Sequence, residues 1–315
     1  MLTLILFLVG LFALVFGAER LVDGAAALSK RAGLSDFLVG ATVVAIGTSL
    51  PELVVSLVGT LQGSPDIALG NVAGSNIMNI LLVLGLTAVV SPIIFPYRVW
   101  EVGMGVCFFI TALSSFLLWE FGVLTRLGAF GLLAFYIIYL LCEARNKPRD
   151  PGDDFIELTG EKKISPVWKI VLNIIVGTGG LAIGGHLFVD SAVKIFTVLG
   201  FSEKFIAATV LAGGTSMPEL ITCLVASYKK KNEIVIGNIL GSNIANIGFV
   251  LGVCGLCSPL TVTLSRVDLL FLAGSAGLLF IATIPQSKGA NGKIPRFFGI
   301  MLLCMYAEYI VFSLL

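Results

Sequence analysis

The 315-residue sequence contains few charged residues. Aspartate, glutamate, lysine and arginine make up 12% of it, and 57% of the residues are hydrophobic. Soluble domains carry roughly 25% charged residues, so this composition excludes a soluble protein. The net charge of +1 argues against nucleic-acid binding. No basic stretch precedes the apolar run at the N-terminus, which therefore predicts a first transmembrane helix and not a cleaved signal. We predict an all-α polytopic membrane protein in a lipid bilayer.

Nitrogen and sulfur ligands for a metal are also scarce. The sequence has one histidine, His186, and six cysteines that lie in or beside apolar runs. Cys254 and Cys257 have the Cys-x-x-Cys spacing of some redox and metal sites. Because neither a second pair nor a nearby histidine accompanies them, we interpret them as small packing residues. No cofactor is predicted.

Long apolar runs supply the transmembrane segments. A span needs ~20 apolar residues, and ten runs of about this length are present, at residues 2–28, 37–60, 67–90, 100–119, 123–142, 166–190, 203–227, 233–256, 264–284 and 295–314. The only long polar segment is 143–165, which contains two prolines and mixed charges and is typical of a solvent-exposed linker. The predicted organisation is a five-helix unit (1–142), a linker (143–165) and a second five-helix unit (166–315).

The two five-helix units are copies of each other. Glu52 matches Glu219, an offset of 167 (219 − 52), and this offset holds without a gap from Gly17 and Gly184 to Pro92 and Pro259. Such a long ungapped match indicates an internal repeat. Because each unit has an odd number of spans, the second must cross the membrane in the opposite sense. The prediction is an inverted repeat, an architecture that places ion sites near the bilayer midplane.

Lysine and arginine predict the orientation. With the N-terminus outside, the loops on the cytoplasmic side carry fifteen basic residues and the outer loops carry four. This asymmetry follows the positive-inside rule. We predict a cell-membrane protein with both termini outside and the linker in the cytoplasm.

The organising motif is Gly-Thr-Ser-x-Pro-Glu, which occurs at residues 47–52 and 214–219. Each copy places a carboxylate inside an apolar span, where it costs ~2.5 kcal/mol or more and indicates a functional site. Pro51 and Pro218 remove a backbone donor and clash with the carbonyl four residues earlier, so we expect the second and seventh helices to be discontinuous. Irregular backbone at this depth is tolerated where it lines a polar cavity.

A second polar face follows each motif. Asn71, Ser75 and Asn79 are spaced four residues apart and share one side of a helix, and Asn238, Ser242 and Asn246 repeat this pattern. With the two glutamates they form an all-oxygen donor set, which disfavours zinc and copper and suits Ca²⁺ or Na⁺. Two carboxylates neutralise one Ca²⁺ or two Na⁺. An empty, doubly charged site would be costly to carry across the bilayer, which favours obligatory exchange.

Residues 45–52 (AIGTSLPE) and 212–219 (AGGTSMPE) resemble the α-repeats of the cation/Ca²⁺ exchanger superfamily. Gly70-Asn71 and Gly74-Ser75-Asn76, with their copies, share the resemblance, which is strongest to prokaryotic Na⁺/Ca²⁺ exchangers and covers essentially the whole chain. The resemblance implies that Glu52 and Glu219 are ligands shared by Ca²⁺ and Na⁺. It implies further ligands: the hydroxyls of Thr48, Ser49, Ser75, Thr215, Ser216 and Ser242 and the carbonyls of Ala45 and Ala212.

The resemblance also implies alternating access, in which the first and sixth spans slide over the other eight. Some relatives, including K⁺-dependent ones, have aspartate at the position of Asn246. With asparagine at both 79 and 246 the site has two titratable groups, which argues against K⁺ co-transport. Proton-coupled relatives typically carry a different motif, although Glu52 and Glu219 could themselves exchange protons. The expected function is electrogenic Na⁺/Ca²⁺ antiport by a monomer, and the alternative is H⁺/Ca²⁺ (or other cation/Ca²⁺) antiport by the same fold.

Two other function classes fit the sequence less well. A Ca²⁺ channel can use a ring of carboxylates, but such a ring is usually assembled from several subunits. An intramembrane hydrolase would need a base beside a nucleophile, and neither Ser49 nor Ser216 has a histidine or lysine near it in the sequence. The protein is therefore not expected to be an enzyme. Asp23, its copy Asp190 and the single histidine His186 are interpreted as residues at the membrane interface or in packing, outside the ion site.

Overall fold

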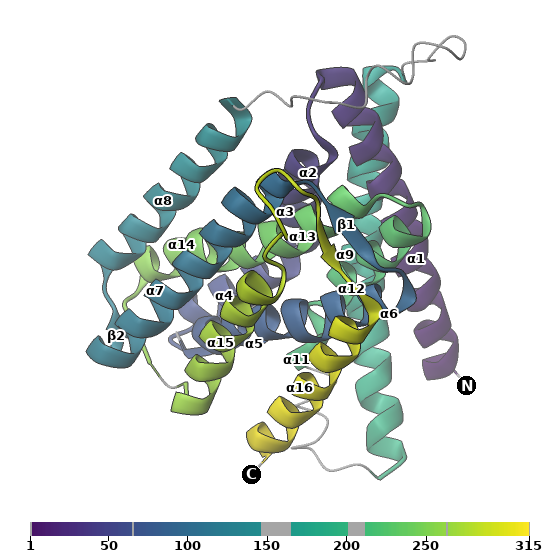
Figure 1. The fold of residues 1–315 in the computed structure, drawn as a ribbon. Helices are drawn as coiled ribbons and strands as arrows, with labels where there is room; N and C mark the ends of the chain where they lie inside the picture. Colours follow the sequence, from purple (N-terminus) through teal and green to yellow (C-terminus); the bar gives the residue numbers. More distant parts are fainter. Residues whose placement is uncertain (1, 65, 146–164, 201–211, 263, 315) are drawn as a thin grey trace.

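The computed structural model describes residues 2–64, 66–145, 165–200, 212–262 and 264–314 (Figure 1). Helices make up most of this part of the chain. The α-helices are α1 (Leu2–Ala32), α2 (Asp36–Val39), α3 (Ala45–Thr48), α4 (Leu50–Leu61), α5 (Asp66–Met78), α6 (Gly85–Val90), α7 (Gly105–Phe121), α8 (Arg126–Arg145), α9 (Val167–Val198), α11 (Ala212–Gly214), α12 (Met217–Tyr228), α13 (Asn232–Ala245), α14 (Leu251–Cys257), α15 (Arg266–Ala282) and α16 (Arg296–Leu314). The described residues also form the π-helical segments η1 (Gly40–Val44), η2 (Asn79–Leu84), η3 (Val99–Met104) and η6 (Asn246–Val250) and the short strands β1 (Ile93–Phe95), β2 (Val123–Leu124), β3 (Leu260–Thr261) and β4 (Gly292–Ile294).

Seven helical segments in the described residues are long and apolar enough to cross a membrane, and an eighth is added if the bent pair Asp36–Thr48 and Leu50–Leu61 is one span. This confirms a helical membrane protein with several spans. The ninth expected span, 264–284, is shorter here, since α15 has 17 residues. Helix α12, with 12 residues, is the C-terminal part of the expected seventh span. The expected seventh span begins at residue 203, which lies outside the described residues, as does most of the predicted linker.

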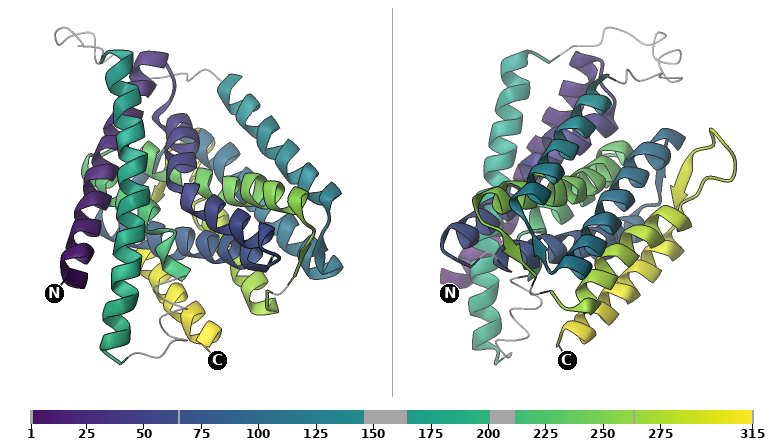
Figure 2. Two further views of the ribbon diagram at one scale, coloured as in Figure 1. Left: turned by 180° about the vertical axis from the view of Figure 1, so that it is seen from behind. Right: turned by 90° about the vertical axis from the view of Figure 1, so that its left-hand side faces the viewer.

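Helices α1 and α9 lie side by side and antiparallel along most of their length, as Figure 1 and both views of Figure 2 show. Glycines allow this close approach. A Cβ added at Gly17 would lie 2.6 Å from the backbone nitrogen of Leu181, and one at Gly184 would lie 2.6 Å from that of Leu14. Both helices continue past the ends expected from the sequence, α1 to Ala32 and α9 to Val198. The pair presents apolar side chains outward, as expected for helices in lipid.

Two buried helical rods, which carry the polar residues of the repeats, form the centre of the molecule. The first runs from α5 through η2 to α6, the second from α13 through η6 to α14, and most of their residues are buried. In each rod the helix widens to π geometry at an asparagine, Asn79 in one and Asn246 in the other. Short π-helical segments are often found at functional sites. These two lie at positions related by the same 167-residue offset as the sequence repeat.

The two small sheets pair one half of the chain with the other. Strand β1 is antiparallel to β4, with Ile93 opposite Ile294, and β2 is antiparallel to β3, with Val123 opposite Thr261. Strand β3 lies 167 residues after β1 and is its counterpart in the repeat. Each of these two strands is hydrogen-bonded to a strand of the opposite half, β1 to β4 and β3 to β2. Both chain termini lie at the lower end of Figure 1, whereas α8 ends and α9 begins at the opposite end.

The helix break in each Gly-Thr-Ser-x-Pro-Glu motif occurs at the serine. Ser49 (φ −85°, ψ 8°) separates α3 from α4, with a bend of 47° between the two helical segments, and Ser216 (φ −87°, ψ 5°) precedes α12. Pro51 and Pro218 fall in the first turn of the helix that follows, where the missing N–H has no helical partner in any case. The discontinuity predicted for the second helix is confirmed by this bend.

Candidate cation site

Glu52 and Glu219 are both fully buried, in the first turns of α4 and α12. A carboxylate in the first turn is favoured by the partial positive charge of the helix N-terminus. The helix breaks at Ser49 and Ser216 therefore do two things: they create two new N-termini inside the protein, and they place one glutamate at each.

Each carboxylate is held by two serines. Glu52 Oε1 accepts hydrogen bonds from Ser75 Oγ and Ser216 Oγ, both at 3.4 Å. Glu219 Oε1 accepts from Ser49 Oγ at 3.1 Å and from Ser242 Oγ at 3.4 Å. The bonds from Ser216 and Ser49 cross between the motifs, so the serine of each motif supports the glutamate of the other. This exchange holds the two carboxylates close together.

Four buried oxygen atoms of the site have no hydrogen-bond partner among the described residues. They are Oε2 of Glu52, Oε2 of Glu219, Oδ1 of Asn79 and Oδ1 of Asn246. A buried acceptor without a partner loses its interaction with water and gains nothing in return. Because all four are oxygens, a hydrogen-bond donor or a cation can satisfy them.

The threonines of the motifs contact polar residues of the opposite half, Thr48 those of α13 and Thr215 those of α5. Thr48 Oγ1 donates to Asn238 Oδ1 at 3.1 Å, and Thr215 Oγ1 donates to Asn71 Oδ1 at 3.3 Å. The same hydroxyls lie 3.5 Å from Ser242 Oγ and 3.3 Å from Ser75 Oγ. Thr48 is also within hydrogen-bond distance of the Ala45 carbonyl, at 3.2 Å. Ala212 is the first residue of α11.

Asparagines join the two central rods directly. Asn79 Nδ2 donates to Asn243 Oδ1 at 3.3 Å, and Asn246 Nδ2 donates to Asn76 Oδ1 at 3.0 Å. Asn76 Nδ2 also donates to the Asn243 carbonyl at 3.0 Å. The amide nitrogens of Asn79 and Asn246 are therefore used between the rods, and their carbonyl oxygens are left for a ligand.

The sequence analysis missed one further pair of residues. Asn71 Nδ2 donates to Ser56 Oγ at 3.0 Å and to the Glu52 carbonyl at 3.2 Å. In the other half, Asn238 Nδ2 lies 3.4 Å from Cys223 Sγ. Ser56 and Cys223 are repeat counterparts one helical turn after each glutamate. That spacing could have identified them, but the different residue types concealed their equivalence.

None of the salt bridges found among the described residues involves the site. They join Arg98 to Glu143, Lys194 to Asp190, Lys229 to Asp23 and Lys231 to Asp36. The two site carboxylates thus lack a basic partner within the described part of the chain. Their negative charge in a fully buried position makes a cation the chemically appropriate ligand.

The remaining candidate residues lie apart from the site. Asp23 and Asp190 are exposed and paired with lysines, and His186 is exposed on α9. Cys254 is buried in α14 and Cys257 is exposed at its end, both as free thiols.

Comparison with known proteins gives a consistent result over the full length. The family model for sodium/calcium exchanger protein matches residues 2–143 and 169–315. A membrane protein of Methanocaldococcus jannaschii is 36% identical, covering 95% of this chain and 94% of its own length. The sodium/calcium exchanger MaX1 of Methanosarcina acetivorans is 28% identical, covering 98% and 97%. The sodium-calcium exchanger NCX_Mj, in a structure soaked with Na⁺ and Ca²⁺, superimposes with a TM-score of 0.84 at 34% identity over 99% of this chain and 98% of that one. The predicted resemblance is confirmed, and this chain belongs to the sodium/calcium exchanger protein family of membrane transporters.

Proposed function

We propose that this protein is a secondary antiporter that exchanges Na⁺ for Ca²⁺ across the cell membrane. The observation that carries the proposal is the pair of buried glutamates, Glu52 and Glu219, each held by a serine of the other motif and each with a free Oε2 atom. Ca²⁺ takes 6–8 oxygen ligands in flexible geometry. Carboxylate, hydroxyl and amide oxygens meet this demand around the two glutamates.

The proposed ion site consists of the twelve residues that the sequence predicts as oxygen ligands, the two glutamates included. They are Glu52, Glu219, Thr48, Ser49, Ser75, Thr215, Ser216, Ser242, Asn79, Asn246, Ala45 and Ala212. The unpartnered oxygens of Asn79 and Asn246 support the inclusion of both asparagines. Na⁺ and Ca²⁺ are substrates here, bound in turn by the same two carboxylates.

The proposed architecture is two inverted five-helix repeats, at 1–142 and 166–315, giving ten spans. The antiparallel α1 and α9 support it, as do the matched π-helical segments at Asn79 and Asn246 and the exchanged strand pairs. With the linker 143–165 in the cytoplasm, both termini are outside. A single chain supplies both glutamates, so the monomer is the proposed functional unit.

Alternating access is the proposed mechanism. The site's two negative charges are compensated when one Ca²⁺ or at least two Na⁺ are bound. An unloaded site carries them through a low-dielectric barrier, which is costly. The transition between inward-open and outward-open states therefore occurs with ions bound, and this couples the flux of Na⁺ to that of Ca²⁺.

The direct test is ⁴⁵Ca²⁺ uptake into proteoliposomes under an outward gradient of Na⁺, K⁺ or H⁺. We expect uptake with Na⁺ and none above background with K⁺. If more than two Na⁺ exchange for one Ca²⁺, an imposed potential should shift the equilibrium by ~2.3 kcal/mol per net charge per 100 mV. Uptake that follows only a pH gradient would replace the proposal by H⁺/Ca²⁺ antiport, and Ca²⁺ flux indifferent to voltage would contradict electrogenic exchange.

The crossed serines give a matched pair of variants. Ser49→Ala and Ser216→Ala each remove one donor to a carboxylate, and hydrogen bonds to charged groups contribute ~1.5–3 kcal/mol. We expect each to raise the half-saturating Ca²⁺ concentration by roughly tenfold, to a similar degree because the two contacts are repeat counterparts. Ser114→Ala, a buried hydroxyl on α7 outside the site, should leave it unchanged. An effect of only one serine would argue against a shared site.

A further inference from the structure

The turn between α12 and α13, residues 229–231, is attached to the first two helices by two ion pairs. Lys229 Nζ lies 2.6 Å from Asp23 Oδ1 of α1, and it also lies 3.5 Å from the Glu19 carbonyl. Lys231 Nζ lies 2.9 Å from Asp36 Oδ2, in the first turn of α2. One lysine of the turn thus contacts α1 itself, and the other contacts the segment that follows it.

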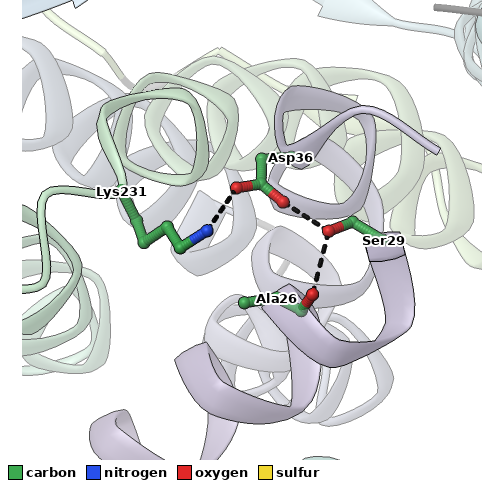
Figure 3. Close-up of polar contacts among 4 residues, drawn as sticks. All are labelled: Ala26, Ser29, Asp36 and Lys231. Atoms are coloured by element: carbon green, nitrogen blue, oxygen red, sulfur yellow. Dashed lines mark hydrogen bonds and ion pairs between the residues drawn. The ribbon is translucent and has the colours of Figure 1, made fainter. Parts of the chain in front are cut away.

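Asp36 connects the second ion pair back to α1. Its Oδ1 accepts a hydrogen bond from Ser29 Oγ in the last turns of α1, and Ser29 Oγ also lies 3.1 Å from the Ala26 carbonyl (Figure 3). Ser29 is 3% exposed and the Asp36 side chain is 24% exposed, so this contact is partly buried. Both carboxylate oxygens of Asp36 are engaged, one by α1 and one by the α12–α13 turn.

Among the described residues, ion pairs of this kind are present at only one of the two equivalent turns. By the repeat offset, residues 229–231 correspond to Gln62, Gly63 and Ser64, which carry no charge. The backbone of the two turns is alike, since Gly63 (φ 83°) and Lys230 (φ 58°) both adopt the left-handed conformation. The turn geometry therefore belongs to both halves, and the lysine side chains belong to one.

The equivalent aspartates of α1 and α9 differ in the same way. Asp190, the counterpart of Asp23, is paired with Lys194 one turn later on α9, at 2.7 Å. That pair lies within a single helix and ties α9 to nothing else. Among the described residues, an ion pair therefore joins the α12–α13 turn to α1, the first helix of the other half. No such pair joins the equivalent α4–α5 turn to α9 in this part of the chain.

We infer that Lys229 and Lys231 form a latch that stabilises the conformation in which α1 rests against the α12–α13 turn. The inference rests on the proposed function, in which α1 and α9 move relative to the remaining helices. The glycine contacts between α1 and α9 lack polar groups that would fix either helix against the core, so the ion pairs at the end of α1 help to set its resting position. Opening the latch must accompany the transition to the other conformation.

Loss of the latch should shift the equilibrium between the two access states. An ion binds only to the state open on its side, so its apparent affinity scales with the population of that state. Breaking the latch therefore changes apparent Ca²⁺ affinity in opposite directions at the two membrane faces. A partly exposed ion pair shifts such an equilibrium by up to about fivefold.

The test compares Lys229→Met, which removes the ion pair to Asp23 of α1, with Lys230→Met in the full-length protein. Both variants remove one positive charge from the same turn, but Lys230 makes none of the salt bridges seen in the described residues and its side chain is exposed. In right-side-out and inverted vesicles, Lys229→Met should change the ratio of half-saturating Ca²⁺ concentrations at the two faces by about two- to fivefold, and Lys230→Met should not. The charge-swapped variant Asp23→Lys with Lys229→Asp should restore the original ratio.

Hydrogen exchange in lipid nanodiscs provides a readout that needs no transport. Backbone amides near residues 19–26 and 227–231 should exchange several-fold faster in Lys229→Met, and at the original rate in Lys230→Met. Equal exchange in the two variants would overturn the latch whether or not the protein transports Ca²⁺. An equal change of affinity at both faces would also overturn it, because a merely structural role would act in that way. Absence of Na⁺-driven uptake in the unmodified protein would instead refute the proposed function.

Discussion

Replacement of Glu52 by glutamine is expected to reduce Na⁺-driven Ca²⁺ uptake at least ~100-fold. Glutamine has nearly the same shape, and its carbonyl oxygen can still accept from Ser75 and Ser216. It replaces the free Oε2 atom by an amide that donates hydrogens, and it removes one unit of charge. At 4 Å and an effective dielectric constant of 20, each pair of unit charges contributes about 4 kcal/mol, and Ca²⁺ doubles this.

Glu219→Gln should have an effect of the same size, because its carboxylate has the same environment in the other half. The matched control is Glu143→Gln, which alters a carboxylate in the last turn of α8 that is 5% exposed but is paired with Arg98. That variant should retain uptake within about twofold. Substantial uptake by either Glu52→Gln or Glu219→Gln, at equal protein levels, would contradict a joint role of the two carboxylates.

Gly241→Val is expected to prevent assembly of the central helices and to lower the yield of folded protein severely. A Cβ at Gly241 would lie 2.5 Å from both the Cα and the carbonyl oxygen of Ala41, in the π-helical segment η1. Backbone atoms cannot move aside as a flexible side chain can, so α13 and η1 must separate. Overpacking of this kind typically costs 1–3 kcal/mol, and we expect at least about 3 kcal/mol here because the clash involves main chain.

Gly131→Val is the control for this second prediction. Gly131 lies on the exposed face of α8, and an added Cβ there meets no atom of the described residues within 4 Å. Thermal unfolding of the detergent-solubilised variants, followed by monodispersity on size-exclusion chromatography, measures the difference. If Gly241→Val is as stable as Gly131→Val, the packing of α13 on η1 in this structure is wrong.

The parts of the site that could be predicted from the sequence are those whose burial in the membrane is energetically unfavourable unless they have a function. A carboxylate in an apolar span is expensive enough that Glu52 and Glu219 are recognisable without a structure, and the repeat offset doubles the signal. The polar faces at Ser75 and Ser242 follow from helical spacing. The predicted helical class and membrane embedding are also confirmed. They could be predicted because a polar backbone buried in lipid can adopt few structures.

Other features depend on tertiary contacts that leave no local trace. The π-helical segments at Asn79 and Asn246 have the apolar pattern of ordinary helix, and only the bonds between the rods distinguish them. Ser56 and Cys223 support the site through Asn71 and Asn238, yet serine and cysteine do not look equivalent in a sequence. The strand pairs join residues about 200 and 140 positions apart, and their few residues lack a pattern of their own.

Two helix boundaries show how local chemistry shifts an expected end. The sixth span was expected to end at residue 190, but α9 continues to Val198. The Asp190–Lys194 pair has i,i+4 spacing, which stabilises a helix, so charge there does not terminate it. The fifth span was expected from residue 123, whereas Val123 and Leu124 form β2 after Gly122, whose left-handed conformation (φ 66°) ends α7.

The most direct test is to locate a heavy divalent ion in crystals of the protein soaked with Sr²⁺, by anomalous scattering. If the two glutamates share the transported cation, the strongest peak will lie between Glu52 and Glu219, about 2.3–2.6 Å from an oxygen of each, the range expected for Ca²⁺. Titration with Na⁺ should weaken that peak. A peak that contacts only one of the two carboxylates, or a map with the ion elsewhere while both glutamates remain bonded to protein alone, would contradict the shared site.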